Sequence, residues 1–143
     1  RTGMTLDEVL SHLASHGGLL GMSEISGDIR DLEQASDDGN TQAHLALDVF
    51  VQEIRRQLGG MLVAMGGADA IVFTGGIGEK GSRIRAAVCE GLEELGIHFN
   101  AEANEAVNGE STFHQSESKV QLWVIPTNEE IIVARQCVDA LNQ

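Results

Sequence analysis

The segment AIVFTGGIGEKGSRIR, residues 70–85, constrains the fold of this chain more than any other. Its first part, Ala70–Thr74, is a continuous apolar run of strand length, which is typical of a strand covered on both faces in a mostly parallel sheet. The glycine-rich stretch Gly75–Gly78 predicts a turn, after which Ser82 is expected to cap a helix that Gly96 ends. A strand, a glycine turn and a helix in this order predict an α/β protein.

The glycine turn is of a kind that binds anions. Free backbone N–H groups and the positive end of a helix dipole attract phosphate, and glycine lets the backbone come close without a Cβ clash. The alternative is that the glycines only make a tight connection between strand and helix. Three glycines within the four residues Gly75–Gly78 exceed what such a connection needs, so we favour phosphate binding.

Two common nucleotide-binding motifs fit this segment poorly. The run Gly76–Gly81 matches G-x-G-x-x-G, but Gly81 precedes the expected helix, and the next expected strand is followed by Asn100 instead of an acidic residue. Dinucleotide binding is therefore a minor alternative. A Walker A loop would need Lys and then Ser or Thr after the second glycine, where this chain has Ser82 and Arg83.

Apolar periodicity and capping signals predict the other elements. Helices are expected at residues 5–17, 28–35, 41–65, 101–107 and from 127 onward, strands at 97–99 and 120–125, and loops at 19–27, 37–40 and 108–118. The helix at 41–65 has the longest apolar repeat and is expected to be a core helix. Capping boxes of Thr5 with Glu8 and of Thr127 with Glu130 are expected to start the first and the last helix.

Composition narrows the class of protein. The 143 residues carry a formal net charge of −13, which leaves no basic patch for nucleic acid or an anionic membrane. The length fits one domain or a piece of a larger one. Cys89 and Cys137 both lie in apolar-periodic segments, so we expect two buried thiols in a reducing compartment, which indicates the cytoplasm.

A second candidate site is VIPTNEEI, residues 124–131, where a buried strand meets an acidic helix start. A carboxylate of Glu129 or Glu130 can hold Mg²⁺ while substrate phosphates fill the metal's other positions. Sequence physics alone favours a simpler role, because acidic residues in a first helical turn complement the helix dipole.

Two weaker candidates lie in the first third of the chain. SGDIRDLE, residues 26–33, places Asp28, Ile29 and Arg30 at a helix start, where Arg30 can stack on a purine or pair with a phosphate. His12 and His16 are spaced i, i+4 on one helix, but no third metal ligand is evident and histidine is favoured near a helix C-terminus without any metal.

Read together, three segments resemble the C-terminal part of the acetate and propionate kinase family. The resemblance is carried by residues 18–21 with 26–32, 71–79 and 125–130, and it extends over residues 1–143. It implies an actin-like ATPase fold, with ribonuclease-H-like domains and a mixed sheet flanked by helices. It also implies reversible, Mg²⁺-dependent transfer of the γ-phosphoryl group of ATP to a short carboxylate, giving an acyl phosphate and ADP, in a protein that we expect to be a homodimer.

The resemblance also implies roles for particular residues. Asp28, Ile29 and Arg30 would line the adenosine pocket. The nucleotide and its phosphates would lie against Gly76, Ile77 and Gly78, with Glu79 and Lys80 completing the loop. Glu129 would be the carboxylate of the Mg²⁺ site. Lys80 departs from the asparagine that the family usually has there, replacing an amide by a flexible cation.

By the same resemblance, the family's first phosphate loop and its catalytic residues lie upstream of Arg1. We therefore expect this chain to be the nucleotide-binding portion of an enzyme, with the N-terminal domain absent and no turnover by the chain alone. The alternative is an actin-like nucleotide-binding or oligomerisation module that performs no chemistry.

Overall fold

The computed structural model describes residues 3–128 and 130–141. The chain divides into two compact units, Arg1–Val63 and Ala64–Gln143. The strand and glycine turn of the opening motif belong to the second unit, and the Asp28–Arg30 segment belongs to the first.

The first unit is helical. It contains α1 (Leu6–His16), α2 (Gly18–Ser23), α3 (Ile29–Asp37) and most of α4 (Thr41–Met65). Thr5 and Glu8 form the predicted capping box at the start of α1, with the Thr5 hydroxyl accepting from the Glu8 N–H and the Glu8 carboxylate accepting from the Thr5 N–H. The helix expected at 28–35 is confirmed, and Asp28 is its N-cap.

The loop expected at 19–27 is wrong in its first half, because α2 occupies it. Leu32, Ala43 and Ala46 form a fully buried cluster, and Leu19 and Met22 pack against it. These two apolar residues are three positions apart, so one helical turn brings both onto the cluster. The residues at 37–40 are exposed, as expected.

Helix α4 spans the expected residues, but only part of it is a core helix. Its buried residues are Ala43, Ala46 and Val51. Met61, Val63 and Met65 near its C-terminus are 58%, 83% and 66% exposed. The periodicity therefore predicted the helix correctly, but the predicted burial holds only for its first half.

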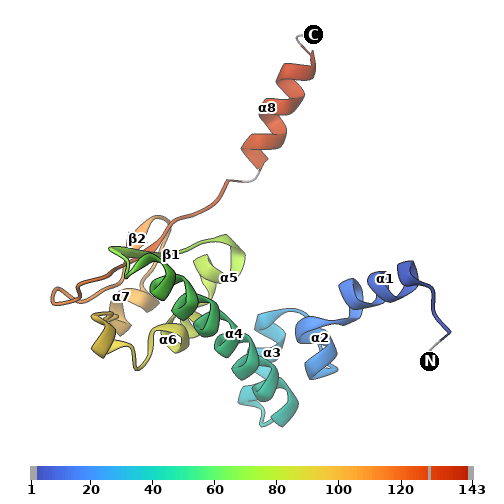
Figure 1. Cartoon of the computed structure of the whole chain (residues 1–143), viewed down its shortest axis with the longest axis horizontal. Helices are drawn as coiled ribbons and strands as arrows, with labels where there is room; N and C mark the ends of the chain where they lie inside the picture. The colour runs from blue at the N-terminus through green and yellow to red at the C-terminus, as the bar shows by residue number, and fades with distance from the viewer. Residues whose placement is uncertain (1–2, 129, 142–143) are drawn as a thin grey trace. The chain divides into compact units, whose positions relative to one another are not determined.

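The second unit is built on a three-stranded sheet with strand order β1-β3-β2. Figure 1 labels β1 and β2 of this sheet. Strand β1 (Ala70–Phe73) pairs in parallel with β3 (Gln121–Val124), and β2 (Ser111–Thr112) pairs antiparallel with β3. The mixed α/β architecture is thus confirmed. Since β1 is an edge strand whose residues alternate between exposed and half-buried, the expected burial of both its faces is wrong.

Short helices lie between β1 and β2. They are α5 (Gly75–Lys80), α6 (Ser82–Cys89), the 3₁₀ helix η1 (Glu93–Leu95) and α7 (Ala101–Glu105). The longer α8 (Glu130–Leu141) follows β3. The helix expected from Ser82 to Gly96 is broken because Glu90 is extended and Gly91 has a φ of 71°. Gly96 is left-handed as predicted.

Two further expectations for this unit need correction. Residues 97–99 form no strand, only an isolated bridge between Phe99 and His114. The polar loop expected at 108–118 contains β2 and also Phe113, which is fully buried with its ring 5.6 Å from that of Phe73. A single apolar residue in a polar stretch is enough to anchor it, and periodicity does not detect one residue.

Helix α8 forms where the sequence predicts a helix, but none of its residues is buried. Cys137 on α8 is consequently exposed, which corrects the expectation of two buried thiols, whereas Cys89 is buried. In the described part of the chain, no helix is long and apolar enough to cross a membrane.

Candidate functional site

The glycine segment after β1 is helical. The sequence predicted a turn here, but Gly75–Lys80 form α5, and α6 begins at Ser82 with Gly81 as its N-cap. Ser82 is therefore not the predicted cap, and its hydroxyl donates instead to Glu105 at 3.0 Å. Thr74 precedes α5 in an extended conformation, and its side chain makes no capping hydrogen bond to the described helix.

Two of the glycines have different surroundings. A Cβ on Gly78 would lie 3.1 Å from the carbonyl carbon of Phe73, so this glycine lets α5 pack closely against the end of β1. A Cβ on Gly76 would meet nothing within 4 Å. Close packing explains Gly78, while Gly76 faces open space and is available for approach by a ligand.

A buried arginine holds the end of α5. The Arg85 side chain comes from α6 and donates through Nη1 to the carbonyl oxygens of Gly78 and Glu79, at 2.9 and 3.0 Å. Its Nε and Nη2 donate to the side-chain and backbone oxygens of Asn104, at 2.8 and 2.7 Å. Arg85 is 2% exposed and Asn104 1%. Burial lowers the pKa of the Arg85 guanidinium from its ordinary value.

Sequence reasoning missed Arg85 and Asn104. The available signal was that Arg85 lies three and four residues before Val88 and Cys89, which places it on the same helical face as these buried side chains. A charged residue on a buried helical face needs partners to compensate its desolvation.

Glu79 connects α5 to the segment after β3. Its Oε1 accepts hydrogen bonds from the backbone N–H and the hydroxyl of Thr127, at 3.0 and 3.3 Å. Nearby, the Ile125 N–H donates to the Phe73 carbonyl at 3.0 Å. The neighbouring Lys80 is exposed, and together with Glu79 it lines a cavity of about 350 Å³ that also borders Arg85 and Pro126.

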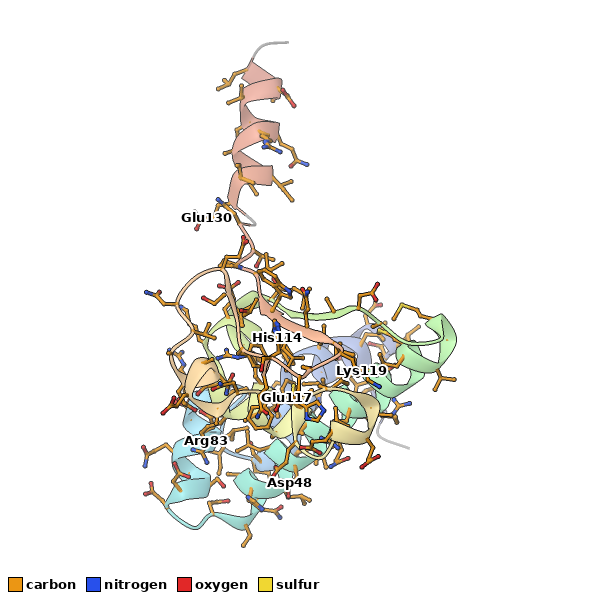
Figure 2. The ribbon with its side chains drawn as sticks, turned by 90° about the vertical axis from the view of Figure 1, so that its left-hand side faces the viewer. Asp48, Arg83, His114, Glu117, Lys119 and Glu130 are labelled. Carbon is orange, nitrogen blue, oxygen red and sulfur yellow. The ribbon has the colours of Figure 1, made fainter. Side chains whose placement is uncertain are left out.

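The acidic helix start is described only in part, because Glu129 lies outside the described residues. Asn128, rather than the predicted Thr127, caps the chain here, with its Oδ1 accepting from the Ile131 N–H at 3.1 Å. Thr127 is unsuited to capping because its hydroxyl donates to Glu79. Glu130 is exposed at the start of α8, as Figure 2 shows.

In the first unit, Asp28 and Arg30 form a bidentate ion pair at the start of α3. Arg30 Nε donates to Asp28 Oδ1 at 3.0 Å and Nη2 to Oδ2 at 2.6 Å, while the Arg30 backbone N–H donates to Oδ1 at 2.9 Å. The guanidinium and the backbone N–H of Arg30 lower the pKa of the Asp28 carboxyl to about 2. The Arg30 side chain is 86% exposed, and Ile29 between them is buried.

The described residues contain no group of three or more His, Cys, Asp or Glu side chains placed to hold a metal ion. His12 and His16 stack their rings with centroids 4.6 Å apart. A magnesium ion held by one carboxylate and the phosphates of a nucleotide does not require such a protein cluster.

An α/β unit with a glycine-rich helix directly after a sheet strand defines a class to which many phosphate-binding proteins belong. The sequence model of the acetokinase family matches residues 1–135. The chain belongs to the acetokinase family, which confirms the resemblance seen in the sequence.

Relatives with known names agree with this assignment. The chain is 46% identical over 142 residues to the acetate kinase of Geobacillus sp. (strain WCH70), covering 99% of this chain and 36% of that protein. It superposes on the crystal structure of Porphyromonas gingivalis acetate kinase with a TM-score of 0.86 and 36% identity, covering 97% of this chain and 35% of the other. For a propionate kinase from Francisella tularensis, the TM-score is 0.81 at 30% identity, with coverages of 92% and 33%. The chain thus spans about a third of the length of these relatives.

Proposed function

We propose that this chain is the nucleotide-binding portion of a carboxylate kinase, which transfers the γ-phosphoryl group of ATP to acetate or propionate and releases ADP and an acyl phosphate. The observation that carries the proposal is the family match over residues 1–135, together with relatives named acetate kinase and propionate kinase. The whole protein would have the actin-like ATPase fold, with a further domain N-terminal to this chain.

In the second unit, the proposed contacts with the nucleotide phosphates lie on α5. Gly76 supports it because its Cα faces open space, so that a phosphate can approach the backbone there. Ile77 is 40% exposed, and Lys80 adds a cation next to the cavity at the end of α5. In the first unit, Asp28, Ile29 and Arg30 are the residues proposed to contact adenosine, because the exposed Arg30 guanidinium offers a flat face to a purine.

Magnesium belongs to the proposal as the partner of the nucleotide. Glu129 is the residue proposed to hold it, with Glu130 as the neighbouring carboxylate. When bound, such an ion neutralises charge on the phosphates. The chain's own contribution is to hold the nucleotide by the backbone of α5 and the segment that Glu79 fixes at Thr127.

The remaining parts of the proposal concern the cell and the assembly. A kinase that uses ATP is expected in the cytoplasm and has no need of nucleic acid or membrane contact, and the family resemblance implies a homodimer. The net charge of −13 is consistent with the last point.

The experiment is an acyl phosphate assay on the full-length protein that contains this sequence. With ATP, Mg²⁺ and acetate or propionate, hydroxylamine should trap an acyl hydroxamate in amounts equal to the ADP released. Omitting the carboxylate should abolish both products. Tight nucleotide binding without any hydroxamate would instead favour a non-catalytic nucleotide-binding module.

A further inference from the structure

We infer that Arg85 is a positioning residue for the nucleotide site. Arg85 lies on α6, is held by Asn104 of α7, and sets the position of the α5 backbone. The expected effect on nucleotide affinity rests on the proposed function. The expected effect on the α5 backbone rests on the contacts of Arg85 alone. Arg85 touches no proposed substrate group, so it would act through the carbonyl oxygens of Gly78 and Glu79.

The need for such a residue follows from the length of α5. In a helix of six residues, the last carbonyl groups have no partner within the helix. The Gly81 N–H donates to the Ile77 carbonyl at 2.8 Å, which leaves the carbonyls of Gly78, Glu79 and Lys80 to find partners outside α5. One nitrogen, Nη1 of Arg85, donates to those of Gly78 and Glu79, and its positive charge at the C-terminal end of α5 also complements the helix dipole.

Arg85 is itself held in place. Asn104 accepts from Nε and Nη2, and its own Nδ2 donates to the Ser82 carbonyl at 2.9 Å. The guanidinium carbon lies 5.5 Å from the centre of the Phe113 ring. A buried guanidinium with this many fixed partners has one orientation, so it transmits the position of α6 and α7 to α5.

Lysine cannot replace this arrangement. Its ammonium is a single point of charge and cannot donate to the two carbonyls and to Asn104 from the fixed fork geometry of a guanidinium. We therefore expect α5 to lose its definition in Arg85→Lys although the charge is kept. The Gly76 backbone would then be less well placed for a phosphate.

Hydrogen exchange on the nucleotide-free, full-length protein tests the structural part. In Arg85→Lys, the protected amides of residues 75–80, which are those of Glu79 and Lys80 at the end of α5, should exchange on the order of tenfold faster, as expected when hydrogen bonds to a charged group are lost. Those of β3 should keep their wild-type rates. Arg83→Lys is the matched control, because Arg83 lies on the same helix with an exposed side chain (Figure 2).

Steady-state kinetics tests the consequence. We expect the KM for ATP in Arg85→Lys to rise about fivefold to tenfold while the KM for the carboxylate changes less than twofold, because only the nucleotide side is displaced. Asn104→Ala provides a second variant if Arg85→Lys does not fold: it removes the acceptor of Nε and should speed exchange at 75–80 and 101–105 by a smaller factor.

The outcomes separate the two proposals. Wild-type exchange at 75–80 in both variants, or an equal increase in β3, would overturn the positioning role. A wild-type protein that neither binds nor turns over ATP would overturn the proposed function, whatever the exchange rates show.

Discussion

The Glu79 carboxylate and the Thr127 backbone, 48 residues apart, are joined by a hydrogen bond of 3.0 Å, which the Thr127 hydroxyl reinforces at 3.3 Å. Glu79 lies in the glycine helix α5, and Thr127 precedes the acidic start of α8. One side chain thus links the two segments of this unit that the sequence marked as candidates for phosphate and for metal.

The first prediction is that Glu79→Ala loosens the segment around Thr127. The Thr127 amide loses its acceptor, so its exchange rate should rise several-fold, in keeping with one exposed hydrogen bond of about 1 kcal/mol. Glu79→Gln keeps an acceptor oxygen and should have a smaller effect. Amide exchange by NMR measures both, with the exposed Glu94→Ala as control. Equal rates at Thr127 in all the variants would show that the bond contributes nothing.

The second prediction separates the two glycines of α5. In Gly76→Ala the added Cβ meets open space, so stability should stay close to that of the wild type while nucleotide affinity falls. In Gly78→Ala the Cβ presses on the Phe73 carbonyl carbon at 3.1 Å, so the free energy of unfolding should drop by about 1–3 kcal/mol.

Urea unfolding and nucleotide titration of the two variants provide the measurement. Gly78→Ala serves as the comparison, because its nucleotide affinity is expected to fall together with its free energy of unfolding. Undiminished nucleotide affinity in Gly76→Ala would contradict the approach of a phosphate to this backbone.

Local signals in the sequence predicted what depends on local physics. The Thr5 and Glu8 capping box, the start of α3 beside Asp28, the bounds of α4 and the left-handed Gly96 are each decided within a few residues. The strand at β3 is likewise marked by its own apolar run. These elements formed where the sequence predicted them.

The errors concern contacts between residues far apart in the chain. Phe113 anchors a polar stretch because it packs against Phe73 and Arg85, which are distant in the sequence. Thr127 does not cap the helix because its hydroxyl donates to Glu79. Periodicity carries no information about either partner. The burial of β1 and α8 was overestimated for a related reason. An apolar face shows that packing against another element would be favourable, but it does not show that such an element is present.

The candidate segments divide in the same way between local and distant signals. The glycine segment and the Asp28–Arg30 segment came from local motifs and the family resemblance. The Arg85 and Asn104 pair that holds α5 was missed, since the two residues are 19 positions apart and neither belongs to a motif.

The third prediction concerns acid stability through Asp28. The pKa of its carboxyl is about 2 in the folded chain, below its ordinary value of 3.8, so the ion pair with Arg30 stabilises the fold fully above pH 4. As the pH falls from about 4 to about 2, the carboxylate is protonated and this contribution is lost. The exposed position of Arg30 keeps it small.

Asp28→Asn is the matched variant, since asparagine keeps the N-cap acceptor and removes only the charge. The difference in free energy of unfolding between wild type and variant should be constant above pH 4 and shrink toward pH 2. Urea titrations at each pH measure it, and added salt should reduce it at the higher pH. A difference that stays flat from pH 5 to pH 2 would contradict the lowered pKa.

The last prediction concerns magnesium at Glu129 in the full-length protein. Glu129→Gln keeps the size of the side chain but removes the charge that helps to hold a hard cation. Turnover should fall and the Mg²⁺ concentration needed for half-maximal rate should rise, while nucleotide affinity measured without metal stays nearly unchanged. Rate measured against Mg²⁺ concentration gives both quantities.

Glu130→Gln is the control for this test. Glu130 is an exposed residue in the first turn of α8, where a carboxylate stabilises the helix through its dipole without any ligand. Its variant should lose a few tenths of a kcal/mol of stability, up to about 1 kcal/mol, with a milder change in the Mg²⁺ requirement. If both variants show the same Mg²⁺ dependence as the wild type, the proposed role of Glu129 in holding the ion is wrong.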